Sequence, residues 1–167
     1  NIDGVEQGDY GKDNFPFDLN RAWGGPPMRH ETLVYQRDVR RWKERCKPVL
    51  GIDFHAPGGC EKDGIYAYLP KPDEFPEEHK EAAKWADVAA GALGSEFAAE
   101  EFGRVADYKS RWETPGFTSF CCSQGFVGLC FETPYAEAGK TLLTREKYRE
   151  AGKKMAEGVC AEFAEMK

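Results

Sequence analysis

Two polar side chains follow apolar runs that are typical of buried β-strands. His55 comes directly after the run 49–54, and Glu132 comes directly after the run 126–131. A neutral imidazole at the end of a strand can bind zinc, and a carboxylate in the same kind of position suits a general base. The alternatives are a hydrogen-bonded structural histidine and a glutamate that faces water. These residues therefore predict a metal-assisted active site, with a structural role as the alternative.

A third candidate is the pair Asn20 and Arg21, which lies in a glycine-rich opening segment. The planar guanidinium group can bind a carboxylate through two parallel hydrogen bonds. This pair could therefore recognise the free C-terminus of a peptide, and the alternative is a loop arginine in a surface salt bridge. The other two histidines, His30 and His79, are expected on the surfaces of helices.

The elements that must position these residues alternate between strands and helices. Strand-like runs occur at 49–54, 64–69 and 126–131. Helical patterns occur at 31–46, at 77–108 (as one helix or as two broken near 91–95), at 118–124 and after Thr144, which is a suitable N-cap. Alternation of this kind predicts the α/β class, in which helices cover a sheet.

Helical spacing also predicts the buried faces of two helices. The first helix is expected to bury Tyr35, Val39, Trp42 and Cys46. The last helix is expected to bury Tyr148, Met155, Val159 and Phe163.

Composition narrows the class of protein. The chain of 167 residues has 23 Lys and Arg against 29 Asp and Glu, a net charge of −6, so we expect no nucleic-acid partner. The basic cluster in 37–47 is interpreted as a solvated helix face. No apolar run approaches the roughly 18–20 residues of a membrane helix, so we expect no membrane partner. The six cysteines allow 15 full pairings, and Cys130 is interpreted as a buried free thiol.

Four short motifs occur along the chain in a fixed order. They are Asn1-Ile2-Asp3-Gly4-Val5, Asp18-Leu19-Asn20-Arg21-Ala22-Trp23, Asp53-Phe54-His55 and Phe131-Glu132. In this order the motifs resemble the zinc metallocarboxypeptidase family, in its cytosolic-carboxypeptidase-like and related bacterial branch. The resemblance implies that residues 1–167 form the C-terminal part of a single catalytic domain. It also implies a mixed sheet in α/β/α layers that is incomplete at the N-terminus.

The resemblance implies a role for each matching residue. His55 matches the third zinc ligand of the family, and Glu132 matches the glutamate that activates the zinc-bound water. Asn20 and Arg21 match the pair that holds the terminal carboxylate of the substrate. Asp18 matches an aspartate that hydrogen-bonds a zinc-ligating histidine. The implied activity is hydrolysis of C-terminal peptide bonds, with a peptide or protein C-terminus as substrate.

The sequence departs from the family pattern in two ways. The H-x-x-E motif, which supplies the first two zinc ligands, does not occur in the chain, so these ligands are expected upstream of Asn1. We therefore expect the chain to be inactive alone and to pair with the missing N-terminal part of the domain. The arginine that stabilises the oxyanion is also absent, and Lys12 could take its place. Tyr108 is the candidate for the tyrosine that covers the substrate.

Two other functions remain open from the sequence. One is a non-catalytic module that binds peptide carboxylates through Asn20 and Arg21. The other is a related zinc amidase or deacylase that acts on a small acylated amino acid.

Overall fold

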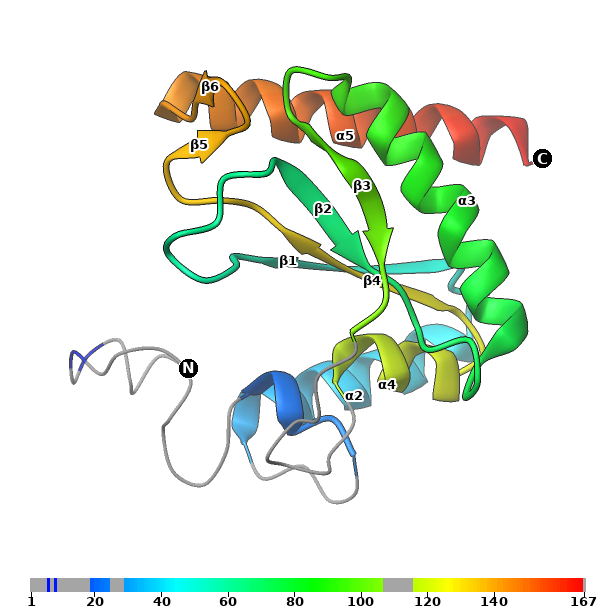
Figure 1. The fold of residues 1–167 in the computed structure, drawn as a ribbon. Helices are drawn as coiled ribbons and strands as arrows, with labels where there is room; N and C mark the ends of the chain where they lie inside the picture. The colour runs from blue at the N-terminus through cyan, green and yellow to red at the C-terminus, as the bar shows by residue number, and fades with distance from the viewer. Residues whose placement is uncertain (1–5, 7, 9–18, 25–28, 107–115, 167) are drawn as a thin grey trace. The chain divides into compact units, whose positions relative to one another are not determined.

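A computed structural model describes residue 6, residue 8 and the ranges 19–24, 29–106 and 116–166 (Figure 1). The helices are the short 3-10 helix η1 (Leu19–Arg21) and the α-helices α2 (His30–Lys43), α3 (Pro76–Leu93), α4 (Phe117–Ser123) and α5 (Arg145–Glu165). The strands are β1 (Leu50–His55), β2 (Ile65–Tyr68), β3 (Ala98–Arg104), β4 (Val127–Glu132), β5 (Glu137–Ala138) and β6 (Thr141–Leu142).

The main sheet has four strands in the order β1-β4-β2-β3, and β5 and β6 form a separate pair. β2 is parallel to β3 and antiparallel to β4. The Val127 amide donates to the Val49 carbonyl at 3.2 Å, and the Thr133 amide donates to the His55 carbonyl at 3.0 Å. Because both partners advance together along the chain, β1 and β4 are parallel. The sheet is therefore mixed and flanked by helices, which confirms the predicted fold class.

The chain divides into two compact units, one formed by residues 1–51 and 107–128 and the other by residues 52–106 and 129–167. In the second unit, α3 packs against β3 and α5, and Figure 1 shows α5 crossing the upper end of α3. The largest side chains of its core are fully buried. They are Trp85, Tyr66, Phe97, Phe131, Ile65, Leu93 and Leu129.

The first unit has a smaller aromatic core. Its buried members are Val39, Phe117, Phe120, Cys121 and Phe126, with Trp23 and Tyr35 packed against them. The Trp23 ring lies 5.3 Å from that of Tyr35 and 5.2 Å from that of Phe117, both in edge-to-face arrangements. Such aromatic pairs stabilise a core beyond the area that they bury.

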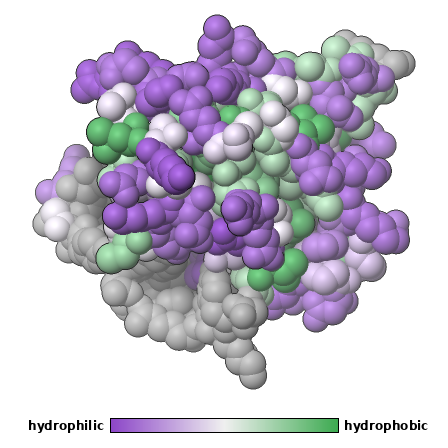
Figure 2. Space-filling model, turned by 45° about the horizontal axis from the view of Figure 1, so that its top comes forward, coloured by the Kyte–Doolittle hydropathy of each residue, from purple (hydrophilic) through white to green (hydrophobic). Residues whose placement is uncertain are grey.

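One face of the molecule is mostly hydrophilic. Figure 2, in which the top of Figure 1 is turned toward the viewer, shows mainly hydrophilic residues, with hydrophobic ones in small separate patches. Exposed ion pairs such as Lys80–Glu77 and Lys84–Glu81 run along α3, where they contribute little to stability. In the part of the chain that the structure describes, no helix is both long and apolar enough to cross a bilayer.

One predicted helix is wrong in its second half. The range 77–108 contains α3, but Gly94 ends it with a φ of +66°, a conformation that favours glycine. Ala98–Arg104 then forms β3, paired in parallel with β2. Its alanine- and glutamate-rich sequence favours a helix, so tertiary pairing has overridden the local propensity.

Two predicted buried faces are also partly wrong. On α2, Val39 is buried, whereas Trp42 is 53% exposed. On α5, Met155 is buried, but Tyr148 and Phe163 are more than one-third exposed. These aromatic residues instead rest at the edge of the packed surface: the Phe163 ring lies 5.0 Å from that of Trp85, and the Tyr148 hydroxyl donates to the Pro134 carbonyl.

Candidate metal centre and active site

The two polar residues that were expected after strands are the last residues of neighbouring strands. His55 ends β1, and Glu132 ends β4. Because the two strands are parallel and adjacent, they end at the same edge of the sheet, where the Thr133 amide donates to the His55 carbonyl. Ligand sites of open α/β sheets gather at this kind of edge.

Alternation along the strands brings four polar side chains to one face. Asp53 and His55 are two residues apart on β1, and Cys130 and Glu132 are two residues apart on β4, so each pair points to one side. Asp53 Oδ2 lies 3.6 Å from His55 Nδ1 and 3.5 Å from Cys130 Sγ. The rings of Phe54 and Phe131, the residues between them, stack on one another with their centroids 5.9 Å apart.

Asp53, His55 and Cys130 form a group that could bind a metal. Each residue offers one ligand atom, and these atoms all lie within 4.8 Å of one another. A carboxylate, an imidazole and a thiol together suit a borderline-soft divalent cation such as zinc better than magnesium or calcium. The donor set therefore fits a metal of the kind that the resemblance implies, although its members differ from those that the resemblance supplies.

Glu132 is buried, with only 7% of its surface exposed. The alternative in which this glutamate faces water is therefore wrong. Tyr66 lies opposite Glu132 in the antiparallel register of β2 and β4 and donates to Glu61 Oε2 at 2.8 Å. Burial raises the pKa of Tyr66, and hydrogen bonds to Glu61 and Tyr68 and the negative charge of Glu132 raise it further. The phenol next to Glu132 therefore stays protonated.

A positively charged side chain, Arg104, lies beside Tyr66 on this face of the sheet. The Arg104 guanidinium lies 3.8 Å from the centroid of the Tyr66 ring and 3.5 Å from a carboxylate oxygen of Asp63. A guanidinium group over an aromatic face is held by cation–π attraction. The face of the sheet that bears Glu132 therefore also carries an aromatic pair, Tyr66 and Tyr68, and a positive charge.

Asn20 and Arg21 form the end of η1 in the first unit. The Phe117 amide at the start of α4 donates to Asn20 Oδ1 at 3.1 Å, and Arg21 Nη1 donates to the Asn20 carbonyl at 2.9 Å. Gly116 leaves room for this arrangement, since a Cβ atom there would lie 3.2 Å from the Asn20 carbonyl oxygen. Binding of a substrate carboxylate by this pair stays a prediction.

Three other predicted site residues, Asp18, Lys12 and Tyr108, lie outside the described residues. His30 is exposed at the first position of α2, and His79 lies with Nδ1 2.8 Å from the Pro70 carbonyl. Neither belongs to the metal-binding group.

Sequence reasoning missed Asp53 and Cys130 as neighbours of His55. Cys130 is buried, as expected, and forms no disulfide. The available signal was spacing: Asp53 lies two residues before His55, and Cys130 lies two residues before Glu132, so each shares a face with the expected site residue. What the spacing could not supply was the pairing of β1 with β4.

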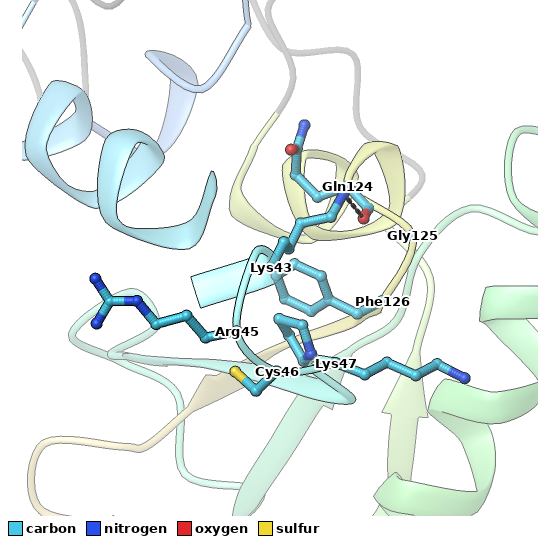
Figure 3. A pocket seen from close by; sticks show the side chains of 8 residues that line it. Lys43, Arg45, Cys46, Lys47, Gln124, Gly125 and Phe126 are labelled. Atoms are coloured by element: carbon cyan, nitrogen blue, oxygen red, sulfur yellow. Dashed lines mark hydrogen bonds between the residues drawn. The ribbon is translucent and has the colours of Figure 1, made fainter. Parts of the chain in front are cut away.

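The basic cluster on and after α2 lines a separate cavity of about 410 Å³. Lys43 points to the Gln124 carbonyl and donates to it at 2.6 Å, whereas Arg45 and Lys47 extend away from each other (Figure 3). The cations do not converge on a common point, as expected of a solvated face.

Comparison of the sequence with known proteins gives no match: no family model and no curated protein matches the chain. Comparison of the structure does. The whole chain superposes on 43% of a metallo-carboxypeptidase from Burkholderia cenocepacia, with a TM-score of 0.71 and 14% identity. It also covers 42% of the product-bound ectoine utilization protein EutE (DoeB) from Ruegeria pomeroyi, with a TM-score of 0.54, 16% identity and 93% of the chain aligned.

These likenesses define the fold. The chain has a carboxypeptidase-like fold, and it spans less than half the length of the two solved structures.

Proposed function

We propose that this chain forms part of the catalytic domain of a zinc-dependent carboxypeptidase, which hydrolyses C-terminal peptide bonds. The observation that carries the proposal is the shared sheet edge at which β1 and β4 end in His55 and Glu132. This edge occurs in a chain with a carboxypeptidase-like fold. His55 is the metal ligand, and Glu132 is the general base.

The chemistry divides between the metal and the side chains. When bound, a zinc ion lowers the pKa of water and polarises the scissile carbonyl. Glu132 accepts a proton from the attacking water and transfers it to the leaving amine, so that the peptide bond gives a carboxylate and an amine. The burial of Glu132 limits competition from bulk water for this transfer. Asn20 and Arg21 bind the terminal carboxylate of the substrate through amide and guanidinium hydrogen bonds.

Two alternatives use the same fold. The likeness to an ectoine utilization protein, which has this fold and a different named role, keeps open a zinc amidase or deacylase that acts on a small acylated molecule. A non-catalytic module would bind peptide carboxylates without turnover. Both differ from the carboxypeptidase in the substrate that is consumed.

The test uses the protein translated from the complete open reading frame that contains this chain. Its substrates are a peptide with a free C-terminus, the same peptide with a C-terminal amide, and an N-acyl amino acid. We expect turnover of the free peptide alone, and Glu132→Gln should lower kcat by about 10²–10⁴-fold. The matched control is Glu100→Gln, which alters an exposed glutamate on β3 of the same sheet.

Wild-type turnover by the Glu132→Gln protein would refute the proposal. Preferential hydrolysis of the N-acyl amino acid would identify the amidase instead, and peptide binding without turnover would identify the binding module.

A further inference from the structure

Two distances within the group of Asp53, His55 and Cys130, both measured from Asp53, are close to those between the ligands of a bound metal ion. Zinc binds carboxylate oxygen and imidazole nitrogen at about 2.0–2.2 Å and thiolate sulfur at about 2.3 Å, so ligand atoms around one tetrahedral ion lie roughly 3.3–3.6 Å apart. Asp53 Oδ2 lies 3.5 Å from Cys130 Sγ and 3.6 Å from His55 Nδ1. All three ligand atoms lie within 4.8 Å of one another. Binding of one ion by all three residues therefore needs the side chains of His55 and Cys130 to close on the ion beside Asp53.

The three ligands lie on neighbouring strands of the main sheet. Asp53 and His55 lie on β1, Cys130 lies on β4, and the two strands are neighbours in the sheet. Sites built on strands hold their ligands more accurately than sites built on loops. The side chains of Asp53 and His55 are each 25% exposed, whereas Cys130 is only 6% exposed. Solvent can therefore reach the group from the side of Asp53 and His55, whereas the Cys130 side chain is shielded from it.

We infer that Asp53, His55 and Cys130 together bind one zinc-like divalent cation within this chain, with Cys130 bound as the thiolate. On binding, the thiol proton is released to the buffer and the sulfur–metal bond forms. The carboxylate and the thiolate balance the two positive charges of the ion. The thiolate selects zinc, cobalt or cadmium over magnesium and calcium.

This inference deepens the proposed function, with which it shares His55. The resemblance supplies His55 as one ligand and expects the other two upstream of Asn1. Here the three ligands all come from the 167-residue chain, so the inference predicts metal binding without any upstream segment.

The experiment titrates the 167-residue chain with Co²⁺ and follows the near-ultraviolet thiolate-to-cobalt charge-transfer band. The exposed cysteines Cys46, Cys60 and Cys160 are first replaced by serine, so that surface thiols cannot bind the ion. We expect the band to saturate at one equivalent of Co²⁺ and to be removed by one equivalent of Zn²⁺, whereas Mg²⁺ should leave it unchanged.

The variants are Cys130→Ser, Cys130→Ala, Asp53→Asn and the control Cys122→Ser. Cys122 is 5% exposed against 6% for Cys130, so both substitutions remove an equally buried thiol. Each Cys130 variant should lose the band, and its zinc affinity should fall by at least the roughly 10–100-fold that loss of an outer-sphere partner costs. Asp53→Asn should weaken zinc binding and keep the band. Cys122→Ser should match the parent protein. Circular dichroism of the metal-free proteins identifies variants that fold.

Three results would overturn the inference: no cobalt binding by the parent chain, a band that survives in a folded Cys130 variant, or loss of the band in a folded Cys122→Ser protein. The experiments can refute the three-ligand metal site and the proposed function independently of each other. If His55→Ala abolishes metal binding by the complete protein and Cys130→Ser does not change it, the three-ligand site is refuted and the proposed function stands. If Glu132→Gln keeps wild-type turnover while Cys130→Ser loses the band, the proposed function is refuted and the metal site stands.

Discussion

The contact between α3 and α5 predicts how added methyl groups on these helices change the free energy of unfolding. Gly158 of α5 faces α3 so closely that a Cβ atom added there would lie 2.6 Å from the Cβ of Ala92. Carbon atoms pack best at about 3.5–4.0 Å, so a methyl group at position 158 must push the two helices apart by about 1 Å. Ala92 has no flexible side-chain end that could move aside. Gly152, on the same helix, has nothing within 4 Å of its added Cβ.

Two opposing effects determine how much each substitution changes the free energy of unfolding. Replacing a helical glycine with alanine stabilises the folded state by about 0.5–1 kcal/mol. Overpacking a tight contact costs about 1–3 kcal/mol. Gly152→Ala should therefore raise the free energy of unfolding by about 0.5–1 kcal/mol, since only the first term applies to it. The helix term is common to both variants, so Gly158→Ala should be less stable than Gly152→Ala by about 1–3 kcal/mol.

The measurement is thermal unfolding followed by circular dichroism at 222 nm, a wavelength that reports roughly on helix content, with the parent chain alongside. For a chain of this size each kcal/mol shifts Tm by about 2–4 °C, so the two variants should differ by about 2–12 °C. Gly91→Ala, on the exposed side of α3 with no neighbour within 4 Å, is a second control and should behave as Gly152→Ala. Equal stabilisation by Gly158→Ala and Gly152→Ala would refute the close packing of α3 against α5.

Two further predictions concern the helix cap and the buried phenol. Thr144 accepts a hydrogen bond from the Lys147 amide at 3.3 Å, so Thr144→Ala should lower the free energy of unfolding by about 1 kcal/mol in urea denaturation, and an unchanged midpoint would contradict the cap. The pKa of Tyr66 is raised, mainly by burial. The folded chain therefore keeps a proton that an unfolded tyrosine loses above about pH 10. Because the folded state then binds more protons than the unfolded state, the free energy of unfolding should fall as pH rises through this range. Tyr66→Phe should reduce that fall, whereas Tyr135→Phe, at an exposed tyrosine, should not; equal slopes would contradict the assignment.

Elements with a strong local signal were predictable from the sequence. The strands expected at 49–54, 64–69 and 126–131 appear as β1, β2 and β4; β1 and β4 are shifted by one residue, and β2 is shorter by one residue at each end. Thr144 caps the last helix as expected. β3 was not predictable, because an alanine- and glutamate-rich segment becomes a strand only through its pairing with β2, which is far from it in the sequence. Local propensity carries no information about that partner.

The candidate site was predictable in its residue types and not in its assembly. His55 and Glu132 were expected at strand ends, and both end strands. The proximity of Asp53 and Cys130 to His55 depends on which strands are neighbours, and the order β1-β4-β2-β3 differs from the order along the chain. A buried cysteine in an apolar strand is also most often only a packed thiol. The strand order, therefore, is what turns Cys130 into a potential ligand.

The apolar residues between the polar ones set the geometry of the site. Phe131 lies between Cys130 and Glu132, is completely buried, and contacts the rings of Phe54 and Phe102. A shift of β4 by one residue would turn Phe131 toward the polar face and move Cys130 and Glu132 to the opposite one. Exposing a buried phenylalanine costs roughly 1.5–3 kcal/mol, and the shift would also separate Cys130 from Asp53. Because one register satisfies both faces, the packing of Phe131 holds the thiol of Cys130 beside the carboxylate of Asp53.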